Sequence, residues 1–148
     1  MTVRVQLADF DAGAEIARLR SGDRGVGAVA SFVGTVRAEN DAAQVDAMVL
    51  EHYPGMTEAV LDDLVASAKT RFNIRDALVI HRVGALAPGD QIVLVAVTSA
   101  HRDSAFDACR YLMDFLKTQA PFWKKERTPA GEHWVEARAS DEAAAGRW

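Results

Sequence analysis

Alternating and periodic apolar positions divide the chain into strands and helices. Short alternating or continuous apolar runs predict strands over 2–7, 26–33, 45–53, 77–83, 91–98 and 133–137. Apolar residues spaced three and four apart predict long amphipathic helices over 56–72 and about 105–116, and a weaker helix over 11–19. The run 91–98 is almost entirely apolar, which is typical of a central strand buried on both faces.

Turn-forming residues separate these elements and give their order. Pro54-Gly55 stops one strand, Pro88-Gly89-Asp90 makes a turn, and Pro121 bars continuation of the second long helix. The segment 34–43 reads as a polar loop, and Ser104 with Asp107 resembles a capping box. The order βαββαββα up to the second long helix predicts an α+β fold with a mixed or antiparallel sheet, in a single domain spanning 1–148.

Composition and charge exclude several classes of protein. With 49% apolar and 26% charged residues, the chain is neither disordered nor membrane-spanning, because no run approaches the ~20 apolar residues of a membrane helix. A net charge of −4 argues against broad nucleic-acid binding. The single cysteine excludes an internal disulfide, and the amino terminus lacks a signal core, so we expect a cytoplasmic protein. The four histidines lack metal-ligand spacing, so we expect no metal site.

Cationic residues at the ends of predicted strands and helices are candidates for anion binding. His101 and Arg102 stand where a buried strand meets a helix, whose first N–H groups favour an anion. Arg37 follows Gly34 at the end of another strand. The alternative for each is a solvated surface arginine, with His101 acting only as a helix cap.

A basic and aromatic segment follows the second long helix. Four cations stand against one acid: Lys117, Lys124, Lys125 and Arg127 against Glu126. Apolar neighbours and nearby cations lower the pKa of a lysine and make its amine available as a nucleophile or base. The alternative is an ordinary basic rim with Trp123 in the core.

Five motifs, in this order, together resemble one known family. They are Leu50-Glu51-His52-Tyr53-Pro54-Gly55-Met56-Thr57, Ser99-Ala100-His101-Arg102, Leu116-Lys117, Ala120-Pro121-Phe122-Trp123-Lys124 and Trp134-Val135-Glu136-Ala137-Arg138. The chain from about residue 26 to its end is similar to the large, catalytic subunit of molybdopterin synthase.

The resemblance implies a fold, partners and a reaction. It implies an α/β-hammerhead-like fold: a mixed sheet packed by two main helices, with an additional antiparallel sheet. It implies a homodimer that binds a small ubiquitin-like sulfur-carrier subunit at each end, giving a heterotetramer. The carrier's C-terminal thiocarboxylate would supply sulfur to cyclic pyranopterin monophosphate (precursor Z) to form the molybdopterin dithiolene. No cofactor is expected.

The resemblance also assigns residues. Lys117 matches the lysine that contacts the carrier's terminal glycine, and Lys124 matches the second essential lysine. The matching anion-binding positions are Arg37, His101, Arg102 and Arg138, and Lys125 joins the substrate-binding set beside Lys124.

The lone cysteine supports an external sulfur source, while other functions stay open. Cys109 falls on the apolar face of a helix, where a buried, inert thiol is expected. Three alternatives compete with sulfur transfer. They are a non-enzymatic docking module for a ubiquitin-like tail, a phosphate-ester or nucleotide-binding enzyme that uses His101 and Arg102, and RNA binding through the lysine and tryptophan segment.

Overall fold

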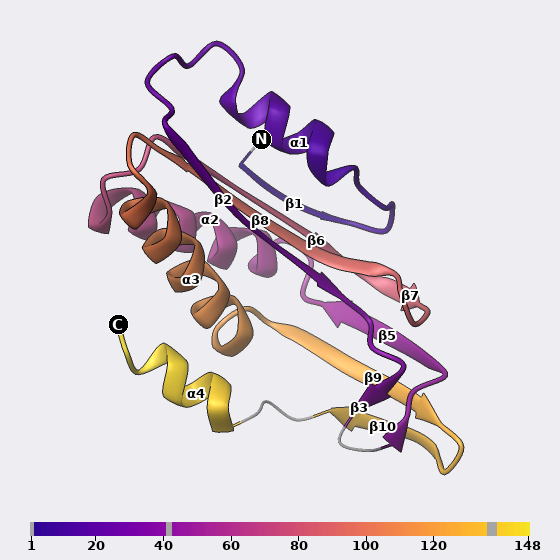
Figure 1. Ribbon diagram of the computed structural model, residues 1–148. Helices are drawn as coiled ribbons and strands as arrows, with labels where there is room; N and C mark the ends of the chain where they lie inside the picture. Colours follow the sequence, from indigo (N-terminus) through magenta and orange to yellow (C-terminus); the bar gives the residue numbers. More distant parts are fainter. Residues whose placement is uncertain (1, 41–42, 136–138) are drawn as a thin grey trace.

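A four-stranded mixed sheet forms the centre of the fold (Figure 1). The computed structural model describes residues 2–40, 43–135 and 139–148. In sheet order the strands are β1 (Val3–Gln6), β6 (Asp76–Arg82), β8 (Gln91–Ser99) and β2 (Ala28–Thr35). β1 is parallel to β6, and the other two pairs are antiparallel, which confirms the predicted mixed sheet.

Helices cover both faces of this sheet. The two long helices, α2 (Met56–Arg71) and α3 (Arg102–Thr118), pack on one face, and α1 (Ala12–Arg20) lies on the other (Figure 1). Alternate residues of β8 therefore enter two separate cores: Val93, Val95 and Val97 belong to the larger one, and Leu94 and Ala96 to the one beneath α1. This confirms that the run 91–98 is a central strand buried on both faces.

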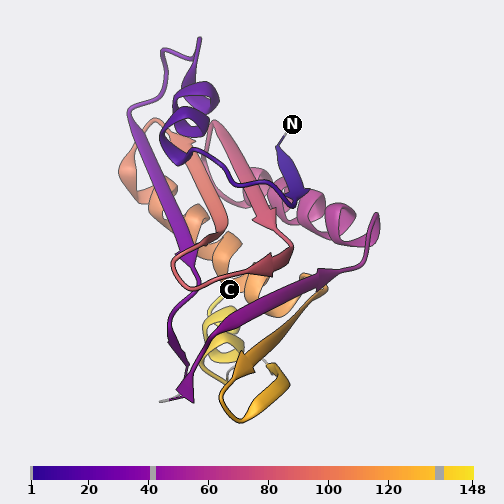
Figure 2. The ribbon, with the colours of Figure 1, turned by 90° about the vertical axis from the view of Figure 1, so that its right-hand side faces the viewer.

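A second, fully antiparallel sheet lies beyond the end of the first (Figure 2). In order it contains β10 (Gly131–Val135), β9 (Phe122–Thr128), β5 (Ala47–His52) and β7 (Gly84–Leu86). A small ladder of β3 (Glu39–Asn40) and β4 (Ala43–Gln44) connects β2 to β5. The expected additional antiparallel sheet is thus confirmed.

Local sequence determines where α2 begins. Gly55 has a φ of +85°, a left-handed conformation that glycine adopts without steric cost. Its backbone N–H donates to the carboxylate of Glu58 at 3.1 Å, and the N–H of Tyr53 donates to Oγ1 of Thr57 at 3.0 Å. These bonds satisfy donors at the helix start and carry the chain directly from β5 into α2.

Several details differ from the sequence predictions. The capping box at Ser104 is wrong, because α3 already begins at Arg102 with His101 as its N-cap residue. The expected loop over 34–43 is partly strand: β2 continues to Thr35 through an irregularity after Gly34, and β3 follows. β7 and β9 are strands that the pattern did not predict, because β7 is very short and β9 has two aromatic residues followed by four charged ones rather than an alternating apolar pattern.

An aromatic cluster holds the C-terminal segment against α3. The segment contains α4 (Ala139–Ala145), which the sequence pattern also missed. The ring of Trp148 packs edge-on against Phe72 and Tyr111, with centroids 5.6 and 5.7 Å away. Its Nε1–H donates to Asp114 at 2.6 Å, and Arg71 donates to its backbone oxygen at 3.2 Å. This anchoring places α4 beside the C-terminal half of α3.

Candidate functional site

A cavity of about 540 Å³ opens where the two sheets meet. We call it the lysine cavity. It is bounded by the end of β2, the end of β6, the last turn of α3, the inward face of β9 and the first turn of α4. Elements from both halves of the chain contribute to it, so the cavity forms only in the folded protein.

Two lysine amines meet in this cavity. Lys117 lies in the last turn of α3, and Lys124 lies seven residues later on β9, after Pro121 has ended the helix. The two side chains line the same cavity, close enough for the charge of Lys117 to act on Lys124. Burial, and then the charge of Lys117, lower the pKa of Lys124 from 10.5 to about 8. Among the described residues, neither lysine forms an ion pair with a carboxylate.

Strand alternation decides which residues of β9 face the cavity. Phe122, Lys124 and Glu126 line it, whereas Lys125 points to the opposite face of the sheet. There the amine of Lys125 lies 3.1 Å from the carboxylate of Glu132 and 5.4 Å from the ring centroid of Trp134. The structure therefore does not bring Lys125 to the site with Lys124.

The basic segment of the sequence predicted a cationic cavity, but the cavity contains charges of both signs. Arg37, just after β2, contributes a third cation to its lining. Three carboxylates also line it: Glu39, the fully buried Glu126, and Asp141 of α4. Glu126 and Asp141 raise the pKa of Lys124, but less than burial and Lys117 lower it.

A buried histidine also lines the cavity. His81, near the end of β6, stacks on Phe122 with ring centroids 3.8 Å apart and an interplanar angle of 17°. Burial lowers its pKa from 6.5 to about 3, so the ring is uncharged at neutral pH. Sequence reasoning considered this histidine only as a metal ligand. The signal in the sequence was a single polar residue, His81, that follows the apolar residues of β6.

The remaining predicted anion-binding residues lie elsewhere. His101 and Arg102 are exposed at the start of α3, about 22 Å along the helix from Lys117 at 1.5 Å per residue. They do not line the lysine cavity of their own chain. Arg138 lies outside the described residues.

The single thiol is chemically inert. Cys109 is buried on α3, as predicted, and burial raises its pKa from 9.0 to about 11. Because only the thiolate is a strong nucleophile, Cys109 is unsuited to carry sulfur at neutral pH.

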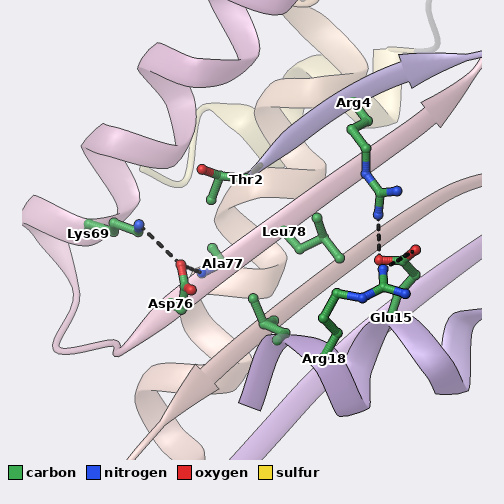
Figure 3. A pocket seen from close by; sticks show the side chains of 9 residues that line it. Thr2, Arg4, Glu15, Arg18, Lys69, Asp76, Ala77 and Leu78 are labelled. Atoms are coloured by element: carbon green, nitrogen blue, oxygen red, sulfur yellow. Dashed lines mark hydrogen bonds and ion pairs between the residues drawn. The ribbon is translucent and has the colours of Figure 1, made fainter. Parts of the chain in front are cut away.

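A second hollow of about 530 Å³ lies between α1, β1 and β6 (Figure 3). We call it the ion-pair hollow. Its cations are all paired: Arg4 and Arg18 contact the carboxylate of Glu15, and Lys69 lies 3.1 Å from Asp76. Burial opposes ionisation of Glu15, but the two arginines hold its pKa below the ordinary value. With its charges satisfied internally, this hollow is a weaker candidate for binding a charged ligand.

Comparison with known proteins decides the family. The MoaE protein family matches residues 5–119 of the chain. The chain belongs to the MoaE family. Within the part of the chain that the structure describes, no helix is both long and apolar enough to cross a membrane.

Individual MoaE relatives match almost the whole chain. The molybdopterin synthase catalytic subunit of Ralstonia nicotianae is 62% identical, covering 99% of this chain and 84% of its own. That of Pseudomonas aeruginosa is 53% identical, covering 100% and 99%. The solved MoaE protein of Burkholderia ambifaria superimposes with a TM-score of 0.86 at 54% identity, covering 99% and 97%. The resemblance seen in the sequence motifs is thereby confirmed.

Proposed function

We propose that this protein is the sulfur-transferring catalytic subunit of a cytoplasmic molybdopterin synthase. It would move sulfur from the C-terminal thiocarboxylate of a small ubiquitin-like carrier to precursor Z and so build the dithiolene. The observation that carries the proposal is the meeting of Lys117 and Lys124 in one cavity of a protein whose only cysteine is buried. Without an accessible thiol of its own, the protein needs sulfur delivered from outside.

The two lysines would perform different steps. Lys117, at the exposed end of α3, would orient or activate the thiocarboxylate carbonyl, or transiently hold the carrier tail. Lys124, with a pKa of about 8, would either stabilise negative charge as the cyclic phosphate opens or transfer a proton. A pKa near the working pH suits proton transfer, because both protonation states are then populated.

Arg37 would hold the cyclic phosphate. Its guanidinium fork suits a phosphate, and it lines the same cavity as the two lysines. We do not include Lys125 in this site, since alternation places it on the other face of β9.

His101 and Arg102 would act from a second copy of the chain. Within one chain they are too far from Lys117 to share its substrate. β2 is an edge strand with three exposed apolar side chains, and two of them, Phe32 and Val33, also line the lysine cavity. Such an edge favours a partner. We therefore propose a homodimer through this region, with one carrier at each end, and light scattering should give the dimer mass.

Reconstitution tests the proposed function directly. The purified protein is mixed with thiocarboxylated carrier and precursor Z, and mass spectrometry follows the dithiolene product and any crosslink at Lys117. We expect product with the wild type and loss of product with Lys117→Ala. Lys69→Ala, in the ion-pair hollow, is the matched control and should keep full activity. Carrier binding without product would contradict sulfur transfer and favour the docking module instead.

A further inference from the structure

The motif over 50–57 ends in Thr57, a residue that no proposed step uses. Thr57 lies in the first turn of α2, and its side chain is completely buried. Its Oγ1 accepts a hydrogen bond from the backbone N–H of Tyr53 at 3.0 Å and donates one to the backbone carbonyl of Pro121 at 3.3 Å. The side chain therefore joins the start of α2 to a segment 64 residues later in the chain.

This hydroxyl lies where a backbone bond between two strands would form. β5 and β9 are antiparallel, and the last pair of their ladder is His52 with Phe122. The next place in the same register sets Tyr53 opposite Pro121. Because proline has no N–H, the two backbones could share at most one hydrogen bond there. The N–H and the carbonyl that would form it both bond to the hydroxyl of Thr57.

Pro121 is the corner between the two elements that carry the lysines. Lys117 lies in the last turn of α3, before Pro121, and Lys124 lies on β9, after it. The corner is tight, because the N–H of Phe122 donates to the carbonyl of Ala120 at 2.8 Å and closes a three-residue turn around the proline. Ala120 and Phe122 both line the lysine cavity. A displaced corner would therefore move the two lysine-bearing elements relative to each other.

Two contacts with other parts of the fold hold this corner. The ring of Phe122 stacks on His81 of β6, with centroids 3.8 Å apart. The carbonyl of Pro121 accepts the hydrogen bond from Thr57. Stacked rings tolerate lateral offsets, whereas a hydrogen bond requires a particular distance and direction. The threonine is thus the contact that determines where the Pro121 carbonyl lies.

We propose that Thr57 is a positioning residue of the lysine cavity: its hydroxyl fixes the carbonyl of Pro121 and so brings the two lysine side chains to one cavity. Without the hydroxyl, the N–H of Tyr53 and the carbonyl of Pro121 lose the partner that they share, and the buried backbone must move to satisfy them. The use of the two amines in sulfur transfer rests on the proposed function, but the position of the corner does not.

The test measures the titration of Lys124 in the protein without carrier or substrate. Trace acetylation with acetic anhydride between pH 6 and 10, followed by digestion and mass spectrometry, gives an apparent pKa for this lysine. Thr57→Val removes the hydroxyl but keeps the shape of the side chain, and Thr57→Ser keeps the hydroxyl. Circular dichroism confirms that each variant is folded, and Thr57→Ala takes the place of Thr57→Val if the latter does not fold.

A second buried threonine supplies the matched control. Thr98 is as completely buried as Thr57, and its hydroxyl also donates to a backbone carbonyl, that of Asp76 at 3.4 Å. It lies near the end of β8 that is remote from the lysine cavity. Thr98→Val therefore removes an equivalent hydrogen bond from the core without touching the corner, and it separates a general loss of stability from a loss of positioning.

The proposal predicts a specific pattern. Thr57→Val should raise the pKa of Lys124 from about 8 toward 10.5, because a displaced corner weakens both the burial of the amine and the effect of Lys117. The uncharged amine available at pH 7 should then fall about threefold to tenfold. In Thr57→Ser and Thr98→Val, the pKa of Lys124 should stay near that of wild type.

Two results would overturn the proposal. One is a wild-type titration of Lys124 in the folded variant that lacks the Thr57 hydroxyl. The other is an equal shift in Thr57→Ser or in Thr98→Val. Because no turnover is measured, a failure of sulfur transfer leaves this result unaffected.

Discussion

The lysine cavity and the ion-pair hollow have nearly the same volume, yet their charges are arranged in opposite ways. In the hollow, Arg4, Arg18 and Lys69 each lie against a carboxylate (Figure 3). In the lysine cavity, Lys117 and Lys124 lie against each other, and among the described residues no carboxylate forms an ion pair with either. The pKa values follow: the pKa of Glu15 falls because Arg4 and Arg18 stabilise its charge, and the pKa of Lys124 falls because burial and then the charge of Lys117 oppose its ammonium form.

This contrast separates charges that stabilise the fold from charges that the proposed function assigns to the reaction. Paired charges lower the free energy of the folded state, whereas two like charges held close together raise it and persist only because the surrounding packing holds them there. Volume alone would not have distinguished the two regions. The arrangement of charge does distinguish them, and four measurements test this distinction.

The largest effect is expected on turnover. Replacing Lys124 by Met should lower kcat/KM for dithiolene formation on the order of 100-fold or more, because it removes the charge and the proton that the proposed mechanism assigns to this lysine. Lys69→Met in the ion-pair hollow should leave kcat/KM unchanged. Lys124→Arg distinguishes the two roles, since loss of activity with retained charge favours proton transfer. Equal rates for Lys124→Met and wild type would remove this lysine from the mechanism.

The second effect is a pH dependence of stability. The pKa of Lys124 is about 8 in the folded protein and 10.5 when unfolded, so between these values the unfolded chain binds more protons. The free energy of unfolding should therefore rise from pH 8 to 10.5, by on the order of 2–3 kcal/mol relative to Lys124→Met. Urea unfolding of both proteins across this range measures the difference. A constant difference between them would show that Lys124 titrates normally.

The third effect is a loss of stability without a loss of function. Glu15→Gln leaves Arg4 and Arg18 without their shared carboxylate and should lower the free energy of unfolding by about 1–3 kcal/mol at pH 7. Because the pKa of Glu15 is lowered in the folded state, its contribution is present above its unfolded pKa and disappears as the pH falls through the folded pKa. The variant and wild type should therefore converge in stability in acid. Reduced turnover in Glu15→Gln would mean that the two regions are coupled.

The smallest effect is expected at the cysteine. Cys109→Ala removes a buried sulfur atom from the core and should lower stability by about 1 kcal/mol while leaving turnover within twofold of wild type. Turnover with a thiocarboxylated carrier is the measurement. A complete loss of activity in a folded Cys109→Ala protein would show that sulfur passes through this residue.

The long apolar patterns predicted most of the fold. The helices α2 and α3 and the strand β8 follow directly from periodicity, because each buries a regular set of side chains. Periodicity could not find β9, whose Phe122–Thr128 sequence is mostly polar and is a strand because β5 and β10 pair with it. It also missed α4, which is held by the distant contacts of Trp148 with Phe72 and Tyr111.

The sequence predicted the lysines of the site, but it did not predict all of the residues that surround them. Family motifs pointed to Lys117, Lys124 and Arg37, and all three line the cavity. They gave no reason to select Asp141, because its approach depends on the packing of α4 against α3. They also grouped Lys124 with Lys125, which only strand geometry separates.

Side chains of β9 alternate between the two faces of the sheet. The length of the connection from α3 to β9 therefore decides whether Lys124 or Lys125 faces the cavity. A single residue inserted between Gln119 and Ala120 would leave every motif intact, yet it is expected to shift the register of the strand by one place and exchange Lys124 for its outward neighbour. Homologues and engineered variants can therefore be screened by counting residues across this junction. A change of one residue there is expected to separate Lys124 from Lys117 as effectively as replacing the lysine itself.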